Sequence, residues 1–366
     1  MHIKISKSSL SEALNTVQVV VASKATLPVL QNVKLTAKGG KVELTCSDLD
    51  ITLRANADCE VIEEGATTIP AKPFAAAVGK LIEGEVKLEV DQQDKTTLSA
   101  GTSVFKFKGL PASEFPEIPS EEGDKCSIDS NILREMLRKV SFATSQDDTR
   151  RTLQGLLIDF LPGSEVKAVA TDGRRMALLE CEVDTTRDFN GKFILPKKAV
   201  DVLLKKLPKE GNAEITSSNG KLLVKTTRIE VLMKLIDDEF PNYMQVMPKQ
   251  IKFTIPVNRV DLVGALDRVS VLTAGEDAPC IVLTFADNVL TLNSSDTEVG
   301  SSRDEVPIKY SDEKIEMRFN PQYIREVLNV IDEDEVDILL NNGSSPAIVR
   351  KGGSDDYNYV VMPLRV

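Results

Sequence analysis

A short polar stretch near the middle of the chain, Asp172-Gly173-Arg174-Arg175, holds the residue types that could do chemistry. A carboxylate beside two guanidinium groups could act as a general base or could bind a phosphate. The stretch also lies between two apolar runs. Asp-Gly in that setting is typical of a hairpin turn, because glycine tolerates a positive φ and aspartate bonds its own backbone. A catalytic carboxylate, a phosphate-binding corner and a plain turn are therefore the interpretations to compare.

The rest of the chain offers few other groups for catalysis. His2 is the only histidine and stands near the start of the chain, so a Ser-His-Asp or Cys-His site is not expected. No P-loop and no G-x-G-x-x-G motif is present, which argues against intrinsic nucleotide hydrolysis. The five cysteines lack C-x-x-C spacing. We therefore predict no metal site, no cofactor and no catalytic residue.

The sequence repeats its features at an interval of about 124 residues, and the Asp172 stretch belongs to the middle copy. Ser47-Asp48 lies 124 residues upstream and Ser295-Asp296 lies 124 residues downstream, each after an apolar, strand-like run. A residue that recurs in every copy usually serves the fold, whereas a catalytic residue is needed once per site. The recurrence favours the turn interpretation.

Two kinds of helix recur at the same interval and would position these stretches. Each copy opens with a short alternating strand followed by an amphipathic helix, and a second, shorter helix follows later near a proline. The first kind is expected at 8–21, 130–142 and 257–271, and the second at 72–81, 197–207 and 321–331. Alternating apolar residues between the helices predict half-buried strands joined by Gly, Asn and Asp turns.

We therefore predict an α+β fold of three repeated domains, each with antiparallel sheets and two helices. Polar or proline-bearing stretches place the domain boundaries at 1–122, 123–249 and 250–366. A repeat this long is too large for a solenoid, so each copy should have its own core.

Charge is divided unequally between the helices and the rest of the chain. The net charge of −11 argues by itself against a nucleic-acid partner. Six windows around the expected helices, 7–24, 72–80, 130–139, 196–209, 257–268 and 320–331, nevertheless carry a net charge of +9, which leaves −20 on the remainder. Solvated basic helices are the simpler explanation for any single helix. Six such windows on an acidic body instead favour a polyanion partner, whose phosphates would be contacted without sequence readout.

If the helices line a hole for duplex DNA, their number sets its size. Adjacent packed helices lie about 9 Å apart, so six in a circle give a diameter of roughly 17 Å and twelve give roughly 35 Å. Only the larger circle has room for a duplex, whose major groove alone is about 12 Å wide. This arrangement requires a homodimer, and a monomeric DNA-coating protein is the alternative.

Four motifs in order resemble those of one known family. They are Thr26-Leu27-Pro28-Val29-Leu30, Thr171-Asp172-Gly173-Arg174-Arg175, Glu239-Phe240-Pro241-Asn242-Tyr243 and the run from Tyr359 to Arg365. Together they resemble the bacterial DNA polymerase III β subunits, the β sliding clamps, over the full length of the chain. The resemblance implies a head-to-tail homodimeric ring of six similar domains that encircles duplex DNA and has no catalytic activity.

The resemblance also implies partners. A clamp loader, itself an ATPase, would open the ring around primed DNA, and the ring would tether the DNA polymerase III catalytic subunit by topology. Other replication and repair proteins would dock by a short peptide motif in a pocket between the second and third domains. The positions that match this pocket are Leu153, Thr171, Gly173, Arg174, Arg175, Met176, Pro241, Val246, Asn320, Tyr323, Ser345, Val360, Val361, Met362, Pro363, Leu364 and Arg365. Apolar residues would form a slot, and Arg175 and the backbone would hold polar groups of the peptide.

Two further sets of residues match the family. The DNA-facing positions are Lys24, Lys72, Ser145, Gln146, Arg150, Arg151, Lys197 and Lys198, and the subunit contact should join Phe105 and Phe107 of one chain to Val271 and Leu272 of the other. Phe105 and Phe107 alternate with lysines, as on an edge strand with one apolar face.

The chain also departs from the family pattern. Many relatives carry His where Arg174 stands, some carry an aromatic pair in place of Arg151-Thr152, and the basic residue often found at Gln245 is missing. Peptide preference and stacking on DNA should therefore differ in detail.

The sequence also indicates where the protein works. No apolar run approaches the ~20 residues of a membrane span, the N-terminus lacks a signal-peptide core, and scattered cysteines fit a reducing compartment. We expect a cytoplasmic protein without a membrane partner. The alternative function is a phosphate-handling enzyme centred on Asp172, Arg174 and Arg175.

Overall fold

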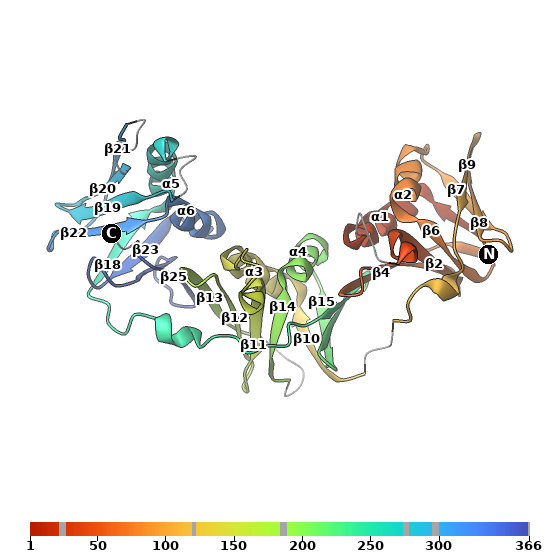
Figure 1. Cartoon of the computed structure of the whole chain (residues 1–366), viewed down its shortest axis with the longest axis horizontal. Helices are drawn as coiled ribbons and strands as arrows, with labels where there is room; N and C mark the ends of the chain where they lie inside the picture. The colour runs from red at the N-terminus through yellow and green to blue at the C-terminus, as the bar shows by residue number, and fades with distance from the viewer. Residues whose placement is uncertain (22–26, 119–121, 184–188, 274–277, 295–299, 365–366) are drawn as a thin grey trace. The chain divides into compact units, whose positions relative to one another are not determined.

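The computed structural model describes residues 1–21, 27–118, 122–183, 189–273, 278–294 and 300–364. These residues form two compact units (Figure 1). The first contains Met1–Asn131 and Lys198–Leu235, and the second contains Ile132–Val183, Asn190–Lys197 and Ile236–Val366. Each unit takes part of the middle repeat. The boundaries at 1–122, 123–249 and 250–366 stay a prediction.

Each of the six predicted helices is present. The α-helices of the described residues are α1 (Lys7–Val17), α2 (Ala71–Lys80), α3 (Ser130–Val140), α4 (Lys197–Lys206), α5 (Arg259–Val269) and α6 (Pro321–Val330). The first helix of each copy is shorter than expected, because its last turn tightens into a 3₁₀ turn at 18–20, 141–143 or 270–272. Local capping fixes the starts, since Ser6 Oγ accepts the Ser9 N–H at 3.0 Å and Asn258 Oδ1 accepts the Asp261 N–H at 3.0 Å.

The first unit contains two antiparallel sheets. Its eight-stranded sheet has the order β10 (Asp124–Asp129), β15 (Asn212–Ser218), β16 (Lys221–Lys225), β17 (Ile229–Lys234), β4 (Ile51–Asp58), β3 (Lys41–Ser47), β2 (Asn32–Lys38) and β6 (Gly65–Pro70). The second sheet has the order β5 (Glu60–Glu63), β1 (His2–Ser6), β7 (Glu85–Val90), β8 (Lys95–Ala100) and β9 (Ser103–Lys108). Helix α1 lies beside α2 and packs against β3 and β4 (Figure 1).

The second unit follows the same plan. Its eight-stranded sheet has the order β14 (Gly191–Pro196), β11 (Gly155–Phe160), β12 (Glu165–Thr171), β13 (Arg175–Glu182), β25 (Tyr357–Val361), β24 (Ala347–Lys351), β23 (Glu335–Leu340) and β18 (Phe253–Asn258). A four-stranded sheet has the order β21 (Arg303–Pro307), β20 (Val289–Ser294), β19 (Ile281–Ala286) and β22 (Ile315–Phe319). Helix α5 lies beside α6 (Figure 1).

Both eight-stranded sheets run from one repeat into the next. In the first unit β17 of the middle repeat pairs with β4 of the first, with Val231 opposite Leu53. In the second unit β25 of the last repeat pairs with β13 of the middle one, with Val360 opposite Met176. The α+β class and the antiparallel sheets are confirmed. Among the described residues, no helix is long and apolar enough to span a membrane.

Candidate functional site

The Asp172 stretch forms the turn between β12 and β13, as its Asp-Gly pair predicts. Asp172 Oδ1 accepts the backbone N–H of Arg174 at 2.8 Å and that of Arg175 at 3.0 Å. Gly173 has a φ of +87°, a value that favours glycine. The carboxylate thus closes the turn, and its second oxygen, Oδ2, accepts a hydrogen bond from Arg175 Nε at 3.0 Å. The matching Asp296 lies outside the described residues.

Arg175 holds the middle repeat to the last one. Its guanidinium pairs with Asp172 and with Glu326 of α6, and its Nη2 donates to the carbonyl of Phe142 at 3.0 Å. The guanidinium also lies 4.4 Å from the ring centre of Tyr323. Burial of the guanidinium tends to lower the pKa of Arg175. Its interactions with Tyr359 and Glu326 have the larger, opposite effect, so the pKa is raised above its ordinary value.

The Arg175 side chain is largely engaged within the protein. Arg175 is only 9 % exposed, and its donors already serve Asp172, Glu326 and a backbone carbonyl. These bonds join the middle repeat to the last through Arg175, and the expectation that Arg175 also holds polar groups of a peptide stays a prediction. Arg174, by contrast, is exposed at the surface of the turn.

An apolar cluster lies next to the turn where β13 and β25 pair. Its buried members include Met176, Leu178, Leu339, Ile348 and Val360. The segment that links the middle repeat to the last packs on this cluster with partly buried side chains, namely Ile236, Phe240, Tyr243, Val246 and Met247. Met362 follows β25, and its N–H donates to the carbonyl of Arg174 at 3.0 Å. The last described residues of the chain therefore lie beside the Asp172 turn.

A polar pocket of about 420 Å³ opens on the other side of the same turn. It brings the turn together with the start of α6 and with the segment after α3. Its lining includes Arg174, Arg175, Asn320 and Tyr323 of the predicted peptide pocket, and Ser145, Gln146 and Arg150 of the predicted DNA set. Asn320 also caps α6, since its Oδ1 accepts the Gln322 N–H at 2.9 Å.

The structure gathers most of the predicted peptide-pocket residues but not all. Members of the turn, the cluster, the pocket or the paired strands between them are Thr171, Gly173, Arg174, Arg175, Met176, Val246, Asn320, Tyr323, Val360 and Val361. Met362 bonds the turn through its backbone. Leu153 is buried and its carbonyl accepts the Ser145 N–H at 2.8 Å. Pro363 and Leu364 follow Met362, and the N–H of Leu364 donates to Arg318 at 2.8 Å. Pro241 and Ser345 line neither the cluster nor the pocket, and Arg365 lies outside the described residues.

Sequence reasoning missed several residues of this site. Phe142, Gln322 and Glu326 line the pocket, and Tyr243 and Met247 pack on the cluster. Tyr243 and Phe240 stand within a motif that the sequence did single out. Glu326 carried no such signal, because its partner Arg175 lies 151 residues away in the chain.

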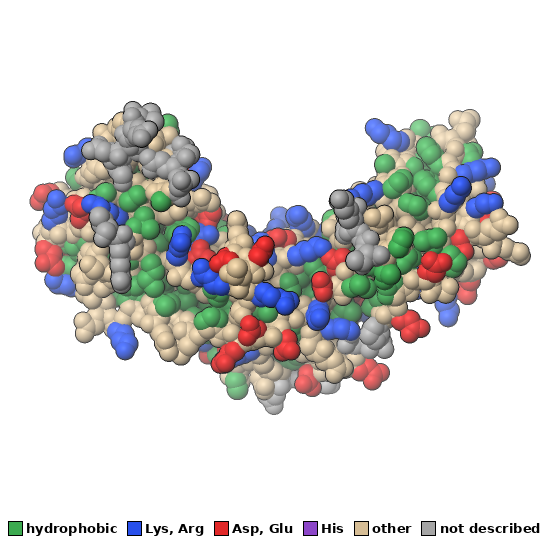
Figure 2. Space-filling view, in the orientation of Figure 1, with side chains coloured by type: hydrophobic (Ala, Val, Ile, Leu, Met, Phe, Trp, Pro, Cys, Tyr) green, Lys and Arg blue, Asp and Glu red, His purple; other side chains and the backbone are tan. Residues whose placement is uncertain are grey.

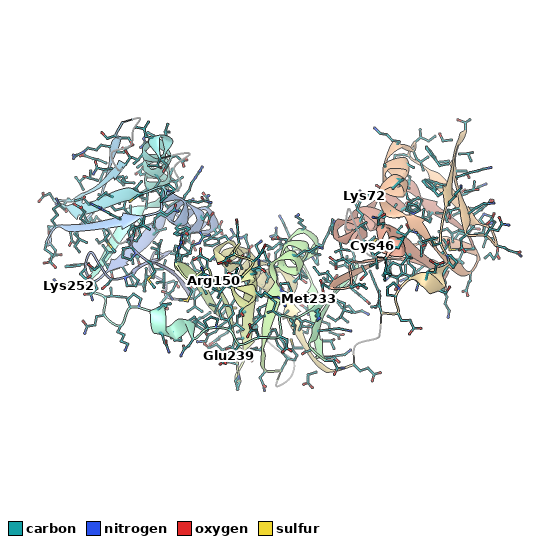
Figure 3. The ribbon with its side chains drawn as sticks, viewed as in Figure 1. Cys46, Lys72, Arg150, Met233, Glu239 and Lys252 are labelled. Carbon is teal, nitrogen blue, oxygen red and sulfur yellow. The ribbon has the colours of Figure 1, made fainter. Side chains whose placement is uncertain are left out.

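The predicted DNA-facing residues are mostly engaged within the protein. Arg150 donates to Asp147 at 3.0 Å and to the carbonyl of Asp172 at 3.3 Å, and Figure 3 labels its place in the second unit. Hydrogen bonds from Thr149, then from Arg150, lower the pKa of Asp147 to about 2, so this carboxylate stays charged. Arg151 is exposed at the start of a 3₁₀ turn, 151–154. Lys24 lies outside the described residues.

The remaining lysines of this set lie on helices. Lys72 lies on α2 in the first unit (Figure 3), where it lines a separate pocket with Lys108. Lys197 and Lys198 begin α4, and Figure 2 shows basic side chains over this helix. Lys198 forms an ion pair with Asp48 of the first repeat. Lys206, at the end of α4, donates to the carbonyl of Asn15 at 2.8 Å.

The predicted subunit contact falls on exposed apolar residues. On β9, an outer strand of its sheet, Val104 is 57 % and Phe105 is 36 % exposed. Val271 is 67 % exposed, and Leu272 follows it in the same 3₁₀ turn. Phe107 is less available, because its ring meets that of Phe74 edge-on with centres 5.5 Å apart. Val104, which the sequence analysis did not name, is the more exposed neighbour.

Comparison with known proteins gives the class of this molecule. Sequence models of the N-terminal, central and C-terminal domains of the DNA polymerase III beta subunit match residues 1–119, 127–242 and 244–365. The beta sliding clamp of Pseudomonas putida is 31 % identical over 370 residues, covering 100 % of both chains. The crystal structure of the Bacillus subtilis DNA polymerase sliding clamp matches with a TM-score of 0.95 at 25 % identity, covering 100 % of this chain and 99 % of that one. The crystal structure of the Pseudomonas aeruginosa sliding clamp bound to griselimycin matches with a TM-score of 0.95 at 30 % identity, covering 100 % of both chains.

The fold and the site therefore define a processivity factor, not an enzyme. The chain belongs to the DNA polymerase III beta subunit family, the beta sliding clamps. A phosphate-handling enzyme centred on Asp172, Arg174 and Arg175 is not supported, and the bonding of Asp172 explains its presence without catalysis.

The bonding of Arg175 leads to a stability prediction. Arg175→Ala should lower the free energy of unfolding by about 3 kcal/mol, because it leaves Glu326 and Asp172 without their buried cation. Chemical denaturation of the full chain measures this. Arg174→Ala, an exposed neighbour in the same turn, is the matched control and should change stability by less than about 0.5 kcal/mol. Equal effects of the two variants would contradict the structural role.

Proposed function

We propose that the apolar cluster and the polar pocket on either side of the Asp172 turn together form the docking site for short peptide motifs of partner proteins. As a family member the chain forms a homodimer that encircles duplex DNA, and it tethers the replicative polymerase and is served by a clamp loader. Since the bacterial chromosome is copied in the cytoplasm, we place this work there.

The observation that carries the docking proposal is that the two surfaces meet at one turn. An extended peptide needs an apolar slot for one or two side chains and nearby polar groups for its backbone. Val246 and Met362 are partly exposed and would supply the apolar side, and Arg174 with Asn320 would supply the polar side. Arg175 contributes by fixing the turn to α6, so that both surfaces keep their relative positions.

The DNA-binding and dimer residues are proposed on separate grounds. Lys72, Arg150, Arg151, Lys197 and Lys198 supply positive charge on helices and turns of an otherwise acidic chain. For the dimer, β9 carries Lys106 and Lys108 beside its exposed apolar residues, and β21 carries Asp304 and Glu305. Both are outer strands, so β9 of one chain pairing with β21 of another would join opposite charges.

Retention on DNA tests the tethering function. After loading onto a covalently closed circular duplex by a clamp loader, the protein should stay bound through gel filtration, and it should be lost once the circle is cut. A ring held by topology has this dependence, whereas a protein bound by phosphate contacts leaves both forms at the same rate. Equal loss from circular and linear DNA would contradict encirclement.

The docking site can be tested apart from the ring. Met362→Glu should weaken binding of a short peptide from a polymerase partner at least tenfold, because it places a charge beside the apolar slot. Fluorescence anisotropy with the labelled peptide measures the affinity. Retention on circular DNA should be unchanged. Ile62→Glu, on β5 of the first unit, is the control for an added surface carboxylate. Unchanged peptide affinity in Met362→Glu would exclude this site.

The dimer surface yields a third test. The double variant Phe105→Glu and Val271→Glu should be monomeric by light scattering at micromolar concentration, because two charges would be buried without partners. Ile62→Glu lies on the opposite outer strand of the same sheet as β9 and should leave the dimer intact. A dimeric double variant would place the subunit contact elsewhere.

A further inference from the structure

Asp48 occupies the same place in the first repeat as Asp172 does in the second. Its Oδ1 accepts the backbone N–H of Asp50 at 3.1 Å and that of Ile51 at 2.8 Å. The carbonyl of Asp50 accepts the N–H of Lys234 at 2.9 Å, as that of Arg174 accepts from Met362. The first oxygen of the carboxylate therefore closes the same kind of turn in both repeats.

The second oxygen is used differently in the two repeats. In Asp172 it binds Arg175 of its own turn, whereas in Asp48 it forms an ion pair with Lys198 of α4, 150 residues away. The Asp48 side chain is 11 % exposed and that of Lys198 is 55 % exposed. A largely buried and hydrogen-bonded carboxylate is thus paired with a lysine that is accessible to solvent and to a polyanion.

We propose that Asp48 tunes the affinity of the clamp for DNA by competing with the phosphates for Lys198. The inference rests on the proposed DNA-binding role of Lys198. A lysine that leaves an internal carboxylate to meet a phosphate exchanges one anion for another, so the net gain is small and fewer counterions are released. Asp48 then acts as a positioning residue that keeps the DNA contact weak.

The chemistry of the pair suits such an exchange. The lysine ammonium is a compact charge on a flexible stem, and ion pairs with one exposed member contribute little stability. When Lys198 leaves Asp48, other contacts still join the middle repeat to the first. Lys206 bonds the Asn15 carbonyl on α1, and Arg228, which follows β16, pairs with Glu12 at 3.1 Å. The surface can therefore release one lysine without losing its support.

Asp48→Asn tests the proposal, because asparagine keeps the oxygen that caps the turn and removes the charge. The full-length homodimer is titrated against a short, labelled linear duplex of mixed sequence, and anisotropy is followed over a range of salt concentrations. The variant should bind about two- to fivefold more tightly at low salt, and the plot of log K against log salt should steepen by about 0.9 for each lysine released. Weakened capping alone would leave this slope unchanged.

Three further variants separate the outcomes. Asp50→Asn removes the same charge from the same turn, where the described residues give Asp50 no ion pair, and it should leave the slope unchanged. Adding Asp48→Asn to Lys198→Gln should have no further effect. Equal behaviour of Asp48→Asn and Asp50→Asn would overturn the inference. If Lys198→Gln weakens binding while Asp48→Asn has no effect, the role inferred for Asp48 is excluded and the DNA contact of Lys198 is retained. If Lys198→Gln leaves binding unchanged, the proposed DNA contact falls with it.

Discussion

The buried guanidinium of Arg175 is the interaction on which the candidate site depends. It ties the Asp172 turn to Glu326 on α6 and to the carbonyl of Phe142, and it stacks on Tyr323. Taking a charge out of water is favourable only when every partner is in place, so this arrangement admits one geometry. Arg175 thus helps to hold the turn that lies between the pocket and the apolar cluster.

The two junctions between repeats share a frame and differ in the residues placed on it. Equivalent strands pair, equivalent turns are capped by Asp48 and Asp172, and equivalent carbonyls accept the N–H of Lys234 and Met362. At the first junction the turn aspartate restrains a lysine of α4, whereas at the second it orders an arginine beside an apolar slot. One inherited turn thus supports two different surface properties.

Local patterns predicted local structure well. Amphipathic spacing located the six predicted helices, and the Asp-Gly pair located the turn. Each of these signals is formed by residues that are close together in the sequence. The joining of sheets across repeats was not predictable, because nothing in the local alternation of β4 or β13 states which distant strand will be its neighbour. For the same reason the pairing of Arg175 with Glu326, 151 residues further along the chain, was not predicted.

Continuous sheets also decide where mechanical force can part the protein. Separating successive repeats would mean breaking the backbone ladder between β4 and β17 or between β13 and β25, each with five paired residues. The outer strands β9 and β21 each pair with a single neighbouring strand of the chain. If two chains meet at these outer strands, as proposed above, parting them breaks no ladder within either chain, and a homodimer has two such contacts. Opening for entry of DNA can then proceed without unfolding any part of the chain.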